Sequence, residues 1–234
     1  MAQARAEKFA GLSRETLQFL VELTENNDRD WFKENQRRYE EQVREPARAF
    51  IRALAPKLKK ITPHLVVSDQ KVGGSLMRPQ RDTRFARDKT PYKTNLGIHF
   101  RHVAGKDVHA PGLYVHLDPG EAFLGAGMWH PDAHALNAVR KRIVAAPKAW
   151  LKARDDAAFC AHFALSGETL SRPPKGYSAD HPCLADLKRK DHIGIARLKG
   201  SALLGADAVE LAVERFRAAK PYMKFLCDAL DLPF

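Results

Sequence analysis

Cysteine is scarce in this sequence, and the three that occur lie far apart. Cys160, Cys183 and Cys227 are odd in number and form no CxxC pair, which argues against a disulfide framework and against a structural zinc site. No run of about 18 apolar residues is available to cross a bilayer. Met1–Ser13 lacks the apolar core of a secretory signal. We therefore expect a cytoplasmic protein with no membrane partner.

Fingerprints of catalysis and of cofactor binding are missing as well. The sequence has no GxSxG nucleophile motif, and none of its cysteines has neighbours that would activate it. Gly73-Gly74 is followed neither by a P-loop lysine nor by a GxGxxG pattern, so no nucleotide cofactor is predicted. RRM, KH and zinc-finger signatures are also absent. The sequence therefore predicts no particular reaction and no cofactor.

Positive charge is what the sequence has in excess. Among 234 residues, 39 Lys and Arg oppose 28 Asp and Glu, for a net charge of +11. A hydrophobic content of 44% is that of an ordinary globular protein, and the chain is long enough to bury a substantial core. A basic protein attracts anionic partners, such as nucleic acid, nucleotides or acidic proteins.

The apolar pattern predicts helices at both ends of the chain and a sheet between them. Helical spacing of apolar residues is found over about 13–60 and again, with interruptions, over about 131–231. Between them, over about 64–128, apolar and polar residues alternate as in half-buried strands, and short links favour an antiparallel meander. We therefore predict a single α+β domain, 1–234, with a mainly antiparallel sheet packed against amino- and carboxy-terminal helices.

Several local features refine this prediction. Val66-Val67 and Val72–Met77 are expected to be strands, the second with a bulge at its two glycines. Residues 78–92 hold two prolines and many charges, which favours a long ordered loop. His192–Leu198 is expected to be an edge strand. The last helical pattern should be interrupted at Pro221.

The loop concentrates the positive charge. Its six cations are Arg78, Arg81, Arg84, Arg87, Lys89 and Lys93. Only Asp82 and Asp88 oppose them, which leaves four cations unmatched, and Tyr92 adds a hydroxyl donor. Arginine holds carboxylate or phosphate in a rigid two-pronged fork. We therefore predict that these nine residues bind a small phosphorylated or carboxylated ligand, with at least three of the cations facing one concave site.

Two other interpretations of the loop stay open. Asp82 and Asp88 would pin the loop by pairing with its arginines, as part of an interaction module that binds no small ligand. Surface ion pairs of this kind contribute little to stability. Alternatively, the loop belongs to a broad basic face that binds nucleic acid, where Phe85, Tyr92 and Trp129 would stack on bases.

A metal site is considered at two histidines and a carboxylate. His116 and Asp118 lie two residues apart on a predicted strand and so face the same side. With His130 they would form a two-His, one-carboxylate set of the kind that binds iron. The short spacing and the turn at Pro119 argue against such a site, and a strand histidine is more often a hydrogen-bonded surface group. We predict no metal.

The loop also carries a family resemblance. Arg81-Asp-Thr-Arg-Phe85, followed by Asp88-Lys-Thr-Pro-Tyr-Lys-Thr94, closely resembles the signature of a conserved hypothetical family, domain of unknown function 2461. Other stretches that fit the same pattern are Asn26-Asn27 before Trp31-Phe32, Pro111–His116, and Gly125-Ala-Gly127. The resemblance covers nearly the whole chain and implies a single domain. It implies no activity.

Overall fold

The computed structural model describes Phe9, residues 11–105 and residues 110–234. Most of Met1–Ser13, where the sequence predicts no secretory signal, lies outside the described residues. Every helix in the described part is too short or too polar to traverse a bilayer.

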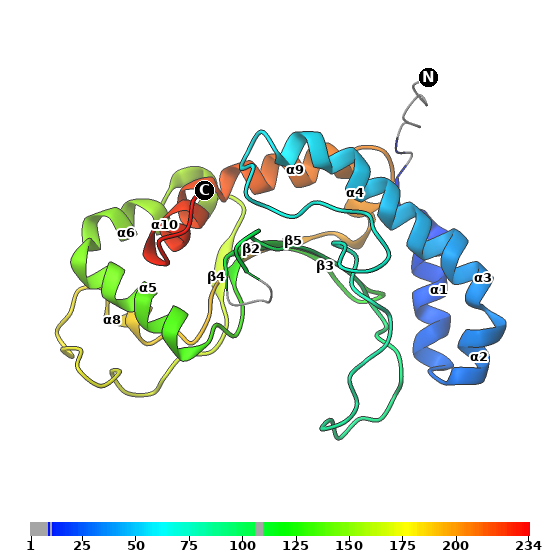
Figure 1. Ribbon diagram of the computed structural model, residues 1–234, viewed down its shortest axis with the longest axis horizontal. Helices are drawn as coiled ribbons and strands as arrows, with labels where there is room; N and C mark the ends of the chain where they lie inside the picture. The colour runs from blue at the N-terminus through cyan, green and yellow to red at the C-terminus, as the bar shows by residue number, and fades with distance from the viewer. Residues whose placement is uncertain (1–8, 10, 106–109) are drawn as a thin grey trace.

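A five-stranded antiparallel sheet forms the centre of the molecule (Figure 1), with the strands in the order β1-β2-β3-β5-β4. The strands are β1 (Leu96–Phe100), β2 (Gly112–Leu117), β3 (Ala122–Met128), β4 (Ala164–Ser166) and β5 (His192–Leu198). The first three form the expected meander, so the predicted α+β class with an antiparallel sheet is confirmed. β5 pairs with β3 on one side and with the short β4 on the other. It is therefore an inner strand, and its prediction as an edge strand is wrong.

The segment before β1 lies along the outer edge of this strand without becoming a strand itself. Isolated bridges join Leu76 to Ile98 and Leu65 to His102. Between these bridges the chain turns at Gly73, whose φ is +71°, and Gly74 lies so close to Gln70 that an added Cβ would be 2.1 Å from its carbonyl oxygen.

This turn overrules the strands predicted at Val66-Val67 and Val72–Met77. A strand needs consecutive ladder hydrogen bonds, and two adjacent glycines in a tight turn interrupt them. The regular sheet consequently begins at Leu96, later than the expected start near residue 64, and it continues past residue 128 into β4 and β5.

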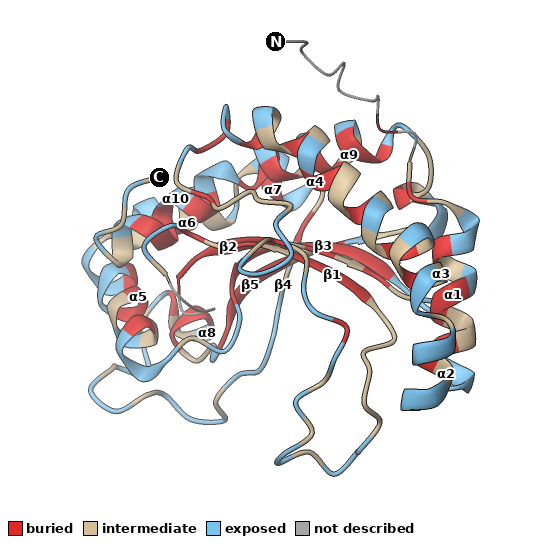
Figure 2. Ribbon diagram, turned by 45° about the vertical axis from the view of Figure 1, so that its right-hand side comes forward, coloured by how far each residue is buried: buried red, intermediate tan, exposed pale blue. Residues whose placement is uncertain are grey.

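Helices cover one face of the sheet. α4 (Glu45–Leu58) and α9 (Ala208–Ala218) lie across it, with α10 (Lys220–Ala229) beside them (Figures 1 and 2). On this side every second residue of β1, β2 and β3 is apolar and buried, among them Leu96, Ile98, Phe100, Leu113, Val115, Leu117, Leu124 and Met128. In the described part of the chain no helix lies over the opposite face (Figure 2), which is therefore open to a ligand.

The remaining helices flank the sheet. On one side are α1 (Arg14–Glu25), α2 (Arg29–Glu34), α3 (Gln36–Tyr39) and the π-helix η1 (Glu40–Arg44). On the other are α5 (Ala133–Ala145), α6 (Pro147–Arg154), α7 (Ala157–Cys160) and α8 (Leu184–Leu187). The 3-10 helix η2 (Gly200–Leu203) lies on the amino-terminal side, where Leu204, directly after it, bridges to Leu12. Pro221 lies in the first turn of α10. The predicted interruption of the last helical pattern is therefore confirmed.

Candidate functional site

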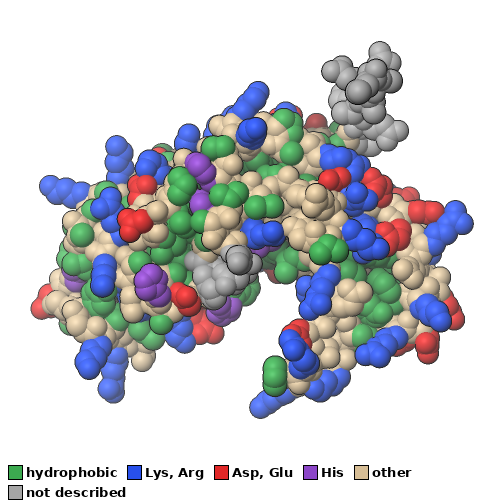
Figure 3. Space-filling view, viewed as in Figure 1, with side chains coloured by type: hydrophobic (Ala, Val, Ile, Leu, Met, Phe, Trp, Pro, Cys, Tyr) green, Lys and Arg blue, Asp and Glu red, His purple; other side chains and the backbone are tan. Residues whose placement is uncertain are grey.

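The open face of the sheet forms the floor of a cleft of about 540 Å³. The space-filling view shows the molecule hollowed between the helices of one half and the loop that projects from the other (Figure 3). Strand residues form the floor, while Met77 and Lys93 line it from the segment that leads into β1, and Trp129 from the end of β3. A volume of this size is typical of small-molecule sites.

Glycines make room for the rings that lie on this floor. A Cβ on Gly112 would be 2.6 Å from Nε2 of His99, and a Cβ on Gly97 would be 2.6 Å from the Tyr114 hydroxyl. Gly125 lies opposite Tyr114 in the β2–β3 register and leaves the middle of the floor free of a side chain. Alternate residues of a strand share a face, which is why the small residues and the rings meet on the same side.

Lys93 brings a positive charge to the rim of this cleft. Its half-buried ammonium group donates to the backbone oxygen of Arg78 at 3.1 Å. Among the described residues no carboxylate pairs with it. Burial, and then the charge of Arg78, lower the pKa of the Lys93 amine. A desolvated cation without a counter-charge favours the binding of an anion.

Two further groups of the cleft are held in their neutral forms. Burial, and then the charge of Arg101, lower the pKa of His99. Burial raises the pKa of the Tyr114 hydroxyl and outweighs the opposing hydrogen bond with Asn95. Both groups therefore offer hydrogen bonds without charge at neutral pH. Displaced pKa values within one cleft are typical of functional sites.

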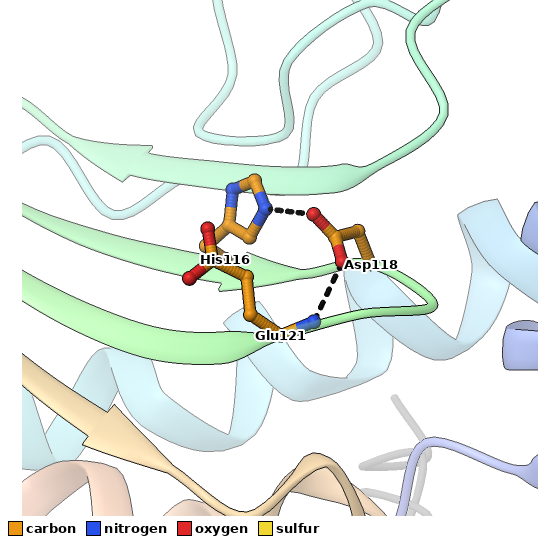
Figure 4. Close-up of side chains that lie close together, drawn as sticks. All are labelled: His116, Asp118 and Glu121. Atoms are coloured by element: carbon orange, nitrogen blue, oxygen red, sulfur yellow. Dashed lines mark hydrogen bonds and ion pairs between the residues drawn. The ribbon is translucent and has the colours of Figure 1, made fainter.

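The β2–β3 turn orients a histidine–carboxylate pair at one end of the cleft (Figure 4). Asp118 Oδ1 accepts from the N–H groups of Gly120 and Glu121, at 2.6 and 2.7 Å. Its other oxygen, Oδ2, lies 2.9 Å from Nε2 of His116. Burial acts to raise the pKa of Asp118, but the hydrogen bonds from His116 and the turn amides outweigh it and lower that pKa.

The ring of His116 is fixed on its other sides too. It stacks on Phe123 with a centroid distance of 4.5 Å and an interplanar angle of 8°. Its Nδ1 lies 3.4 Å from both the Tyr114 hydroxyl and the Asn95 amide nitrogen. A histidine held in this way can relay a proton or offer Nε2 to a metal ion.

Glu121 is the third possible ligand beside His116 and Asp118. In the sequence, His130 was considered for this position. Ligand atoms of His116, Asp118 and Glu121 all lie within 4.8 Å of one another. The imidazole of His130 instead lies 3.7 Å from Asp191, through Nδ1 and Oδ1. His130 therefore does not join His116 and Asp118, because β3 carries it to the far end of the hairpin.

The tip of the cationic loop projects away from the cleft and pairs its charges internally (Figures 1 and 3). The guanidinium of Arg84 donates to Asp82 through two bonds, of 2.9 and 2.6 Å, and its side chain is 77% exposed. Lys89 Nζ donates to the backbone oxygen of Thr83 at 2.9 Å. Arg87 is exposed, and Phe85 is 96% exposed.

The base of the loop behaves differently. Arg81, Asp88, Tyr92 and Lys93 line a smaller pocket of about 350 Å³, in which the Arg81 guanidinium pairs with the Asp88 carboxylate. Lys93 also lines the larger cleft. The structure thus brings together four of the nine predicted residues. Two of them are cations, so the expected convergence of three cations is not seen in either of these two pockets.

Asn27 and Phe32 anchor the base of the loop to the amino-terminal helices. The Asn27 amide donates to the backbone oxygen of Tyr92 and accepts from its N–H, both at 3.0 Å. The ring of Phe32 stacks on that of Tyr92 at a centroid distance of 4.0 Å. The base of the loop, unlike its tip, is therefore part of the packed structure.

Most groups of the cleft were missed from the sequence, among them Asn95, His99, Tyr114 and Glu121. A signal for them exists. On β1 and β2 the residues between the buried apolar ones are rings and glycine, where an ordinary solvent-facing strand would carry charged groups. That pattern is typical of a sheet face that is shielded in part from water.

Fold and site together define an α+β protein whose antiparallel sheet is covered by helices on one face and bears a ligand-sized cleft on the other. Residues 15–225 match the family described as conserved hypothetical protein (DUF2461). The chain therefore belongs to this family, as the motif in the loop led us to expect. No curated protein and no solved structure matches the chain.

Proposed function

We propose that this protein binds a small organic anion in the sheet cleft, with a carboxylate or phosphate at Lys93 and a flat apolar body over the floor. One observation carries the proposal: a half-buried ammonium group, with no carboxylate partner among the described residues, stands at the rim of a cleft of about 540 Å³. We keep the cytoplasmic location expected from the sequence as part of this proposal.

The character of the lining supports an apolar body. Met77 and Trp129 are 40% and 51% exposed and both line the cleft. Large apolar side chains left open in a concave place are typical of binding sites. With glycine at Gly112, Gly125 and Gly127, the floor is low enough for a ring to lie against it.

The charge at the rim supports an anionic group on the ligand. Burial lowers the pKa of Lys93 because it removes water that would stabilise the charged amine. A bound anion would stabilise that ammonium group in place of the water. A charged hydrogen bond of this kind contributes about 1.5–3 kcal/mol. Of the nine loop residues predicted from the sequence to bind an anion, this proposal keeps Lys93 as the one that holds it.

A pair of fluorescent probes tests this proposal. 8-Anilino-1-naphthalenesulfonate is a flat anion, and N-phenyl-1-naphthylamine is its neutral counterpart. Replacing Lys93 by Met should weaken binding of the sulfonate by about 10- to 150-fold and leave binding of the neutral probe nearly unchanged. The matched control is Lys89→Met, because Lys89 also donates to a backbone oxygen of the loop but lies outside the cleft.

Fluorescence titration gives both affinities for each variant. Equal losses in Lys93→Met and Lys89→Met would mean that the loop attracts anions only through its general charge. An unchanged ratio of sulfonate to neutral-probe affinity in Lys93→Met would reject the proposal.

Nucleic-acid binding is the second candidate, and the exposed tip of the loop favours it. Phe85 is 96% exposed between the exposed cations Arg84 and Arg87, an arrangement able to stack on a base and contact phosphates. A binder that contacts about six phosphates should lose about 300-fold in affinity for single-stranded oligothymidylate between 50 and 200 mM salt. In anisotropy measurements, Phe85→Ala should weaken that binding by about 1–3 kcal/mol. Absence of binding at the lower salt concentration would remove this candidate.

A further inference from the structure

We propose that His116, Asp118 and Glu121 bind one first-row divalent metal ion, such as Zn²⁺ or Mn²⁺, at the end of the cleft. This inference does not rest on the binding of an organic anion. The three groups lie on one hairpin, with His116 near the end of β2, Asp118 in the turn and Glu121 at the start of β3. Their ligand atoms fall within 4.8 Å of one another.

The spacing of the first two groups fits a shared ion. His116 Nε2 and Asp118 Oδ2 are 2.9 Å apart. Two ligands that each lie about 2.1 Å from one ion, at roughly a right angle, are separated by about 3 Å. An ion can therefore replace the hydrogen bond between them with little movement of either side chain.

Both groups are already oriented for this role. Two backbone N–H groups hold Asp118 Oδ1, which leaves Oδ2 directed toward His116. The Phe123 ring holds the imidazole plane, and Tyr114 and Asn95 face its Nδ1. With the proton on Nδ1, donated to the Tyr114 hydroxyl oxygen, the lone pair on Nε2 is free for the metal. Outer hydrogen bonds of this type are usual for metal-bound histidine.

Glu121 supplies the third ligand and must change partners to do so. Its carboxylate now pairs with Arg197 at 2.8 Å, and the arginine side chain is 76% exposed. Because an exposed pair contributes little, a divalent ion competes with it easily. Arg197 is therefore a competitor of the metal, and its removal should strengthen metal binding.

The choice of metal follows from the donors. One imidazole nitrogen and two carboxylates suit Zn²⁺, Mn²⁺, Fe²⁺ or Co²⁺ better than Mg²⁺ or Ca²⁺, which prefer oxygen ligands alone. The two carboxylates balance the charge of a divalent ion. Three protein ligands leave at least one coordination position open, and because His116 and Glu121 line the cleft, that position faces it.

Calorimetric titration of the whole chain with Zn²⁺ alone, and absorption of its Co²⁺ form, test the site. We expect one bound ion and a visible Co²⁺ spectrum. His116→Gln and Asp118→Asn should each weaken binding at least 100-fold, since losing even an outer-shell partner commonly costs 10- to 100-fold. Glu121→Gln, at an exposed position, should weaken it at least tenfold. Arg197→Met should bind the ion several-fold more tightly than the parent.

His130→Gln is the matched control, because this exposed histidine lies outside the three-residue cluster. It should leave the affinity for Zn²⁺ unchanged. A loss in His130→Gln as large as that in Glu121→Gln would show surface binding of the ion and overturn the proposal. So would binding that is indifferent to both Glu121→Gln and Arg197→Met, two exposed substitutions that should not disturb folding.

Discussion

The tip of the cationic loop, residues 82–87 with Lys89, and the sheet cleft differ in how their charges are exposed to water. The tip holds the densest charge of the sequence, yet Arg84 and Asp82 form an ion pair that is exposed to solvent. The cleft holds fewer charges, and it partly buries the Lys93 amine, which has no carboxylate partner within residues 11–105 and 110–234. A charge attracts an anionic ligand more strongly when it is partly buried, because water screens it less. The number of charges that are neighbours in the sequence matters less.

The first prediction concerns the base of the loop, where we expect the largest effect. Replacing Asn27 by Leu removes both hydrogen bonds with the Tyr92 backbone and leaves its N–H and carbonyl groups without partners in a half-buried place. Each such loss costs about 1–3 kcal/mol, so urea unfolding should show a free energy of unfolding lower by about 2–4 kcal/mol.

The adjacent Asn26 provides the control for this measurement. It is exposed, and its side chain donates to the backbone oxygen of Glu22. Asn26→Leu should therefore cost less than about 1 kcal/mol. If both variants lose the same stability, the base of the loop is no better anchored than an ordinary helix end, and the contrast with the tip disappears.

The second prediction separates the floor of the cleft from the stability of the sheet. A Cβ at Gly125 would meet Tyr114 Cβ at 3.4 Å, an ordinary contact. Gly125→Ala should therefore leave stability unchanged or raise it by about 0.5–1 kcal/mol, because glycine is unfavourable within a strand. The added methyl group would stand in the floor, and both naphthalene probes should bind more weakly, by about 1–3 kcal/mol. Unchanged binding of both would place the ligand elsewhere.

The outcome for these regions shows what the sequence could predict. Alternating apolar residues predicted the antiparallel meander, and Pro221 predicted the break between the last two helices, because both signals act locally. The chain next to β1 was mispredicted because the turn at Gly73-Gly74 interrupts a stretch of strand-forming residues.

The site was harder to predict because it depends on tertiary structure. In the sequence Lys93 is one of six similar cations, and only its burial beside the sheet distinguishes it from Lys89. Tyr114 and His116 were visible on the polar side of a strand, but the arrangement of the helices decides that this side forms a cleft. The motif of the loop identified the family correctly but did not distinguish the tip of the loop from its base.

The third prediction uses pH to test the charge at the rim. Burial lowers the pKa of Lys93 below its ordinary value of 10.5, and a bound sulfonate would raise it again. Affinity for 8-anilino-1-naphthalenesulfonate should therefore be full at neutral pH and begin to fall, as pH rises, before 10.5 is reached. A fall of about tenfold corresponds to 1.4 kcal/mol.

Arginine in place of Lys93 is the control for this titration, because it keeps its charge throughout this range. The Lys93→Arg profile should be flat where that of the parent falls. Parallel profiles for the two proteins would assign the titration to another group.

The smallest effect is expected at the tip of the loop. Hydrogen bonds from the side chain and from the backbone N–H of Arg84 lower the pKa of Asp82 strongly. Both groups are nevertheless surrounded by water, which screens the pair and limits its contribution to folding. Arg84→Ala should therefore keep Tm within about 2 °C of the parent and should leave the affinity for both probes unchanged.

Arg81→Ala is the matched variant, because Arg81 pairs with Asp88 inside the smaller pocket. It should lower Tm more than Arg84→Ala does. Were Arg84→Ala to lower Tm by more than Arg81→Ala, the tip would be the structural part of the loop and the comparison would be reversed.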